Sequence, residues 1–155
     1  MTTERPTTDD QKALLLWAAE CAEHVMHHFE AARPEDGRPR AAIKAGRAWV
    51  RGELTLSTVR AAVFAAHAAA REVDDPAAVA AARAAGHAAA TAHIATHAPG
   101  SAWYGLKAVR AAAAHDDAQE QDAETREHLW QRRHLPDDLR AFVDELEERK
   151  GIRHP

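Results

Sequence analysis

The chain has 155 residues, a formal net charge of −4 and a single cysteine, Cys21. This length suits one domain with a sizeable core, and a lone thiol excludes an internal disulfide or a thiolate metal site. The acidic balance makes nucleic acid an unfavoured partner. The polar N-terminus lacks the signal-peptide pattern, and no apolar run approaches about 18 residues, which predicts a cytoplasmic protein without a membrane span.

Alanine fills 39 positions, and this composition favours helices because Ala loses no side-chain entropy in a helix. The boundaries follow from polar capping residues before each segment and from Pro or Gly after it. In chain order, the predicted helices cover residues 11–32, 39–52, 57–73, 76–97, 101–115, 118–134 and 136–151. Ser57 and Ser101 are the predicted caps of the third and fifth helices.

The links between these segments are mostly short, which favours antiparallel neighbours. The sequence therefore predicts an all-α fold, a single-domain antiparallel bundle of about six to seven helices. The predicted domain spans residues 11–151, with flexible tails at residues 1–10 and 152–155.

Histidine is unusually frequent, with 11 residues, and it recurs at helical spacing on three predicted helices. The spaced positions are Trp17, Cys21, His24 and His28 on the first helix, His67 and Arg71 on the third, and His87, His93 and His97 on the fourth. If these faces meet inside the bundle, the imidazoles converge.

Two functional interpretations fit converging imidazoles. One is a divalent transition metal held by His24, His67, His93 and His97, completed by a carboxylate. The other is a metal-free site in which His24, His67 or His93 acts as a general base near Tyr104 and Lys107. A structural or solvent-exposed role for the histidines is the third alternative, and the absence of HExxH and paired ExxH motifs favours it.

A basic stripe crosses the second predicted helix. Arg40, Lys44, Arg47 and Arg51 follow at i, i+4, i+7 and i+11, and so share one face. Such a stripe could bind an acidic protein partner or this chain's own C-terminal region, where residues 116–150 hold twelve Asp or Glu against six Lys or Arg. A solvated helix face is the competing interpretation.

Aromatic residues are few enough to interpret individually. Six occupy positions that predict core anchors in an Ala-rich bundle, namely Trp17, Phe29, Trp49, Phe64, Trp130 and Phe142. Trp103 and Tyr104 directly follow the turn at Pro99 and Gly100, where a pocket mouth could form. Simple packing across a helix corner is the competing interpretation, and it is somewhat favoured.

Five segments resemble the bacterial "putative immunity protein" family: LWAAECAEHV (16–25), RPRAAI (38–43), AWVRGE (48–53), AAHAAARE (65–72) and AHIATH (92–97). The similarity extends over most of the chain, through residues 129–131 and 135–136. The resemblance implies an all-helical cytoplasmic protein that neutralises a toxin by binding it. Many matched residues are polar, and from these and their neighbours a ligand site is expected at Trp17, Arg38, Arg71, Trp103 and Lys107.

Two classes of function remain open at this point. The first is an immunity-type binding protein that acts through an exposed surface such as the basic stripe, and an Ala-rich bundle is also compatible with homodimerisation. The second is a small helical enzyme or a protein that binds a small molecule at a histidine-lined internal site, with or without a metal.

Overall fold

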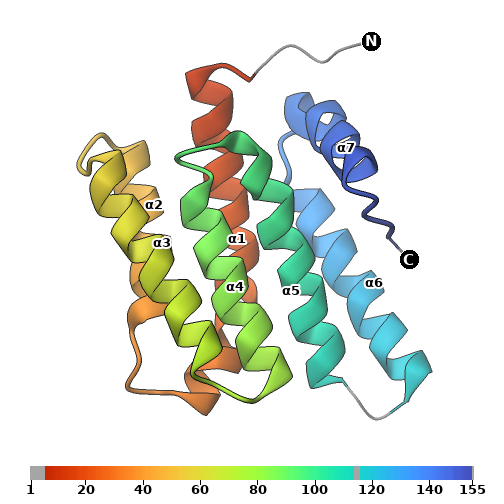
Figure 1. Cartoon of the computed structure of the whole chain (residues 1–155). Coiled ribbons are helices and arrows are strands. Elements are labelled where there is room, and N and C mark those ends of the chain that lie inside the picture. The colour runs from red at the N-terminus through yellow and green to blue at the C-terminus, as the bar shows by residue number, and fades with distance from the viewer. Residues whose placement is uncertain (1–5, 114–115, 155) are drawn as a thin grey trace.

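The computed structural model describes residues 6–113 and 116–154. This part of the chain contains seven α-helices, two short 3-10 helices and no strand, which confirms the predicted all-α bundle (Figure 1). The α-helices are α1 (Thr8–Ala32), α2 (Arg38–Val50), α3 (Leu56–Arg71), α4 (Pro76–Ala90), α5 (Ala98–Ala112), α6 (Asp117–His134) and α7 (Arg140–Arg149). The 3-10 helices are η1 (Ala95–His97) and η2 (Asp137–Leu139).

Short polar side chains start four of the helices. Thr7 accepts a hydrogen bond from the backbone N–H of Asp10, whose carboxylate accepts one from the N–H of Thr7. Thr55, Asp75 and Asp116 cap α3, α4 and α6 in the same way, each accepting from the N–H three residues on. These caps satisfy backbone donors that a helix start leaves unpaired.

The helices α3, α4 and α5 lie side by side, with α4 between the other two (Figure 1). Behind them, α1 packs on α4 and α5, and α2 packs on α1, α3 and α4. The helix α6 packs on α5, and α7, which lies near the end of α6 in Figure 1, contacts α5 and η2. Within the described residues, no helix is long and apolar enough to cross a membrane.

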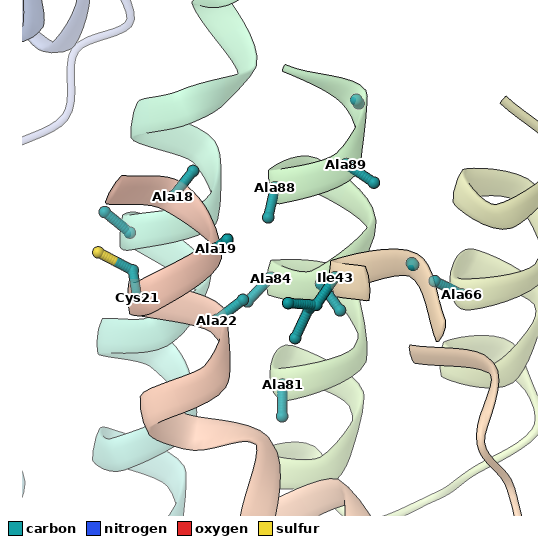
Figure 2. Close-up of a cluster of buried hydrophobic side chains, with 14 of the residues drawn as sticks. Ala18, Ala19, Cys21, Ala22, Ile43, Ala66, Ala81, Ala84, Ala88 and Ala89 are labelled. Carbon is teal, nitrogen blue, oxygen red and sulfur yellow. The ribbon is translucent and has the colours of Figure 1, made fainter. Parts of the chain in front are cut away.

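The central helix α4 is built almost entirely from buried alanines (Figure 2). Because alanine side chains are short, α1, α2, α3 and α5 can all approach the α4 backbone closely. Ser101 reinforces this contact from α5: its hydroxyl oxygen lies 2.9 Å from the carbonyl oxygens of both Ala18 on α1 and Ala84 on α4. The core around α4 is therefore filled by the close approach of helix backbones more than by large side chains.

The predicted fourth and fifth helices had wrong boundaries. The helix α4 ends at Ala90, seven residues before the predicted end at His97, and the chain turns through Ile94 into η1. The next helix, α5, begins at Ala98 with Pro99 in its first turn, so Ser101 is a buried interior residue and not its cap. Thr55, not Ser57, caps α3. The predicted end of the fifth helix, His115, lies outside the described residues.

Residues in both predicted tails make side-chain contacts. In the predicted N-terminal tail, α1 already begins at Thr8, and Thr7 caps it. Residues 1–5 lie outside the described part. At the other end, the His154 imidazole contacts the Glu147 carboxylate at 2.8 Å and stacks on His128. Residue 155 also lies outside the described part.

Candidate functional site

The outward surface of α3, α4 and α5 carries positive charge without negative charge. These three helices contain five Lys or Arg and no Asp or Glu, although the whole chain has 24 acidic residues. Helical spacing brings the polar residues into outward stripes. We call this surface the basic face, and its residues are Arg60, Phe64, His67 and Arg71 on α3, Arg83 and His87 on α4, and Trp103, Tyr104 and Lys107 on α5.

Among the described residues, no carboxylate pairs with the cations of the basic face. In residues 6–113 and 116–154, no ion pair joins Arg60, Arg71, Arg83 or Lys107 to an Asp or Glu. The fifth cation of these helices, Arg110, instead pairs with Glu120 and Glu124 on α6. Four cations on neighbouring helices without counter-charges give this face a positive potential.

The predicted basic stripe on α2 has its counter-charges on α1 and in the following loop. Arg40 donates two hydrogen bonds to Glu30, at 2.9 and 2.7 Å, and Arg51 donates two to Glu53. Arg47 pairs with Glu23. Of the stripe, only Lys44 is a cation without an ion pair in the described part of the chain. The stripe is thus largely neutralised by this chain's own carboxylates, and these come from α1 and from the loop after α2 rather than from the C-terminal region.

Three imidazoles meet on the basic face. The ring centroids of His67 and His87 are 5.5 Å apart, and those of His87 and His97 are 5.4 Å apart. Tyr104 stacks on His87 with a centroid distance of 5.1 Å, and Arg83 Nη1 lies 2.9 Å from His67 Nδ1. We call these five residues the histidine cluster.

Two glycines make room for the rings. A Cβ on Gly86 would lie 2.6 Å from His67 Cε1 and Nε2, and a Cβ on Gly100 would lie 2.8 Å from His87 Nδ1. Both contacts are too short for a real carbon atom, so any side chain at these two positions would displace an imidazole. The rings of His67 and His87 therefore rest directly on the backbones of α4 and α5.

The histidines of the cluster are neutral at pH 7. Burial, and then the charges of Arg83 and Arg71, lower the pKa of His67 from 6.5 to about 4. Burial, together with the neighbouring basic groups, lowers the pKa of His87 to about 4 as well. The pKa of His97 is lowered by burial and by Lys150, whose ammonium donates to the Thr96 carbonyl oxygen at 2.7 Å.

Aromatic and cationic side chains continue this surface along α5. The Lys107 ammonium lies 3.8 Å from the centroid of the Trp103 ring and 5.6 Å from that of Tyr104, which are cation–π distances. The two aromatic rings meet edge to face at 5.1 Å. Trp103, Tyr104 and Lys107, which were predicted as site residues, thus lie together beside the histidine cluster.

The four histidines predicted to share a metal site are not brought together. His67 and His97 both belong to the histidine cluster. His93 instead donates from Nε2 to the Leu56 carbonyl oxygen at 3.1 Å, and His24 contacts Glu127 on α6. Across the described residues, no group of three or more His, Cys, Asp or Glu is placed to hold a metal ion.

His24 belongs to a second feature, a groove that α1 and α6 line together with the end of α5, which we call the α1–α6 groove. Its Nδ1 lies 2.8 and 2.9 Å from the two carboxylate oxygens of Glu127, whose side chain is only 6% exposed. The His24 ring stacks on Trp130 at 3.7 Å, and Trp130 stacks on His134. The groove has a volume of about 580 Å³, and its lining includes His24, Glu127, Leu129 and Trp130.

Two other predicted ligand-binding residues have structural contacts. The Trp17 indole is buried and donates to the Gln131 carbonyl oxygen at 2.9 Å, which fastens α6 to α1. Arg38 pairs with Asp36 and Glu72, so it ties the loop before α2 to the end of α3. Neither residue reaches the basic face, whereas Arg71 lies on it.

Phe64 is not the core anchor that its aromatic character predicted. Val59, Val63, Ala66 and Ala70 form the buried stripe of α3, and Phe64 lies about 100° away from Val63 around the helix. Its side chain is 66% exposed, on the α3 part of the basic face. Trp17 and Phe29 are buried as predicted, Trp49 and Phe142 are partly buried against the core, and Trp130 lines the groove.

Two central residues of the histidine cluster are not among the predicted site residues. His87 shares helical spacing with His93 and His97 in the sequence, whereas Arg83 is not part of any predicted stripe. Val79, Arg83 and His87 repeat every four residues in the alanine-rich α4, and after Pro76 they are its only residues that are not buried. That repeat is the signal that could have identified them.

Comparison with known proteins places the chain in a family but gives no characterised relative. A model of the family described as "Imm-5 like putative immunity protein" matches residues 4–138, which include α1 to α6 and end before α7. Searches of the curated proteins and of the solved structures found no match to this chain. Because the match covers well over half of the sequence, the chain belongs to the Imm-5 like putative immunity protein family.

Proposed function

We propose that this protein neutralises a toxin by binding an acidic surface of that toxin on the basic face. The observation that carries the proposal is the charge distribution: three adjacent helices hold five Lys or Arg and no Asp or Glu. Family membership supports a protein partner, and charge complementarity indicates the sign of that partner's surface.

The composition of the face also suits protein recognition. Tryptophan, tyrosine and arginine are the residues that most often dominate binding energy at interfaces, and an exposed Phe64 offers an apolar contact between Arg60 and Arg71. The aromatic pair Trp103 and Tyr104 adds rigid contact area near Lys107. By contrast, the cations of α2 would have to exchange existing ion pairs with α1 for new ones with a partner.

Charge reversal on the two surfaces tests this proposal. The candidate toxin is sought among the products of neighbouring genes, as the one that arrests growth of a bacterial host alone and is neutralised by this chain. Arg71→Glu with Lys107→Glu should weaken toxin binding at least about a hundredfold and abolish protection, because like charges oppose each other at the contact.

The matched control is Lys44→Glu with Arg51→Glu, which makes the same charge change on α2. We expect this variant to bind and protect like the wild type. Circular dichroism establishes that both variants are folded. Full protection by the variant of the basic face, together with loss of protection by the control, would refute the proposed surface.

A further inference from the structure

The histidine cluster is rich in hydrogen-bond donors. Because Nδ1 of His67 accepts from Arg83, the ring proton of neutral His67 is assigned to Nε2. In His87, Nδ1 is buried and has no hydrogen-bond partner in the part of the chain that the structure describes. If the proton of His87 is on Nε2, the buried Nδ1 carries only an unpaired lone pair. This costs less free energy than burying an unpaired N–H group. Both rings therefore carry their proton on Nε2.

Acceptors for these donors are scarce. The Tyr104 hydroxyl and the remaining N–H groups of Arg83 have no hydrogen-bond partner in the described part of the chain, and α3, α4 and α5 hold no carboxylate. Other arginines of the chain do have carboxylate partners, for example Arg40 with Glu30 and Arg132 with Asp144. Within the cluster, the acceptor Nδ1 of His67 is already used by Arg83, and the other donors have no carboxylate beside them.

The charged groups that face the histidine cluster from the neighbouring elements are all basic. Arg71 faces the cluster from α3 and Arg83 from α4, while Lys150 approaches His87 and His97 from the residue after α7. His93, which precedes η1, adds a further basic group beside His97. From α5 the cluster receives the Tyr104 ring.

We propose that the histidine cluster binds a tetrahedral oxyanion, such as sulfate or phosphate, through Arg83, the Nε2–H groups of His67 and His87, and the Tyr104 hydroxyl. Arginine and imidazole N–H groups are suited to oxyanions because charge-assisted hydrogen bonds match several acceptor oxygens at once. A cation is unsuited, since Arg83 occupies Nδ1 of His67 and adds a positive charge there. The inference goes beyond the proposed function, because it concerns a small anion and requires no toxin.

Protonation strengthens such binding. A bound anion stabilises the charged form of nearby imidazoles and raises their lowered pKa values, so the complex takes up protons. The affinity for sulfate should therefore rise as the pH falls from about 7.5 to about 5.5. Sulfate keeps its charge across this range, so the change reports the protein alone.

Imidazole NMR of the full chain during titration with sodium sulfate tests the proposal, with sodium chloride holding the ionic strength constant. We expect saturable shifts of the His67, His87 and His97 resonances, and none for His134, which lies on α6. Equal shifts of all histidines, or shifts that chloride reproduces, would overturn the proposal. Comparing inorganic phosphate with adenosine monophosphate then distinguishes a free anion from the phosphate of a nucleotide.

Variants locate the anion. Arg83→Gln should weaken sulfate binding about tenfold, the loss expected for one charge-assisted hydrogen bond, and Lys44→Gln on α2 should leave it unchanged. Tyr104→Phe removes only the hydroxyl and should weaken binding several-fold, which gives a second measurement if Arg83→Gln does not fold. Unchanged affinity in Tyr104→Phe and in a folded Arg83→Gln variant would contradict the assignment.

Discussion

Replacing Ala84 by Leu is expected to lower the free energy of unfolding by about 3 kcal/mol. Ala84 is fully buried on α4, and its carbonyl oxygen lies 2.9 Å from the Ser101 hydroxyl. The three additional carbon atoms of leucine fit only if α1 or α5 moves away from α4. Such a movement separates the packed helix backbones and breaks the contact between Ser101 and the Ala84 carbonyl oxygen. Urea denaturation measures the loss as a lower transition midpoint.

The matched control is Ala41→Leu on α2, where the side chain is exposed. Leucine and alanine both favour helix, so this variant should change the free energy of unfolding by less than about 0.5 kcal/mol. Similar losses in the two variants would contradict the interpretation of α4 as a tightly enclosed alanine helix.

The second large effect is a loss of stability in mild acid. His67 and His87 have pKa values of about 4 in the folded protein, against 6.5 for an ordinary histidine. Between these values the unfolded chain binds more protons than the folded one, so stability falls as the pH is lowered from about 6.5 towards 4. After allowance for their partial exposure, we expect the two histidines to lower the free energy of unfolding by about 2 kcal/mol between pH 7 and pH 5.

Denaturation at several pH values checks this expectation. His67→Gln combined with His87→Gln should flatten the pH dependence in this window, because the groups that titrate differently in the two states are gone. The control, His134→Gln, changes a histidine whose ring stacks on Trp130 at the surface and should retain the slope of the wild type. An equally steep dependence in the double variant would assign the acid sensitivity to other groups.

The sequence predicted the helical class and most helix positions because the local signals are strong. Polar caps such as Asp75 precede α4, and the alanine content disfavours strands. The end of α4 was missed because residues 91–97 contain no Gly or Pro. There the Thr91 hydroxyl donates to the His87 carbonyl oxygen, a local bond that competes with continued helix, and Ile94 is extended.

The site was predicted only in part because periodicity identifies faces but not which faces meet. His67, His97, Tyr104, Trp103 and Lys107 do lie on one surface. The partners of His24 and His93 are Glu127, 103 residues away, and the Leu56 carbonyl oxygen, 37 residues away. No spacing rule within a single helix carries that information.

The charged surfaces were also predicted only in part, because the sequence does not show which carboxylates lie beside which cations. The stripe of Arg40, Lys44, Arg47 and Arg51 is conspicuous in the sequence, but Glu30 and Glu23 on α1 neutralise two of its arginines. The basic face is less conspicuous because its cations are spread over residues 60–107. The lack of Asp and Glu in three consecutive helices was present in the sequence and is the signal that identifies it.

Hydroxyl-radical footprinting of the chain, alone and bound to the toxin that it neutralises, tests the proposed interface most directly. This measurement reports the exposure of individual side chains, and both candidate surfaces contain suitable reporters. We predict protection of Phe64, Trp103 and Tyr104 on the basic face, with Leu129 and Trp130 in the α1–α6 groove unchanged. Protection of Leu129 and Trp130, with Phe64 and Trp103 still reactive, would contradict the account and assign toxin binding to the groove.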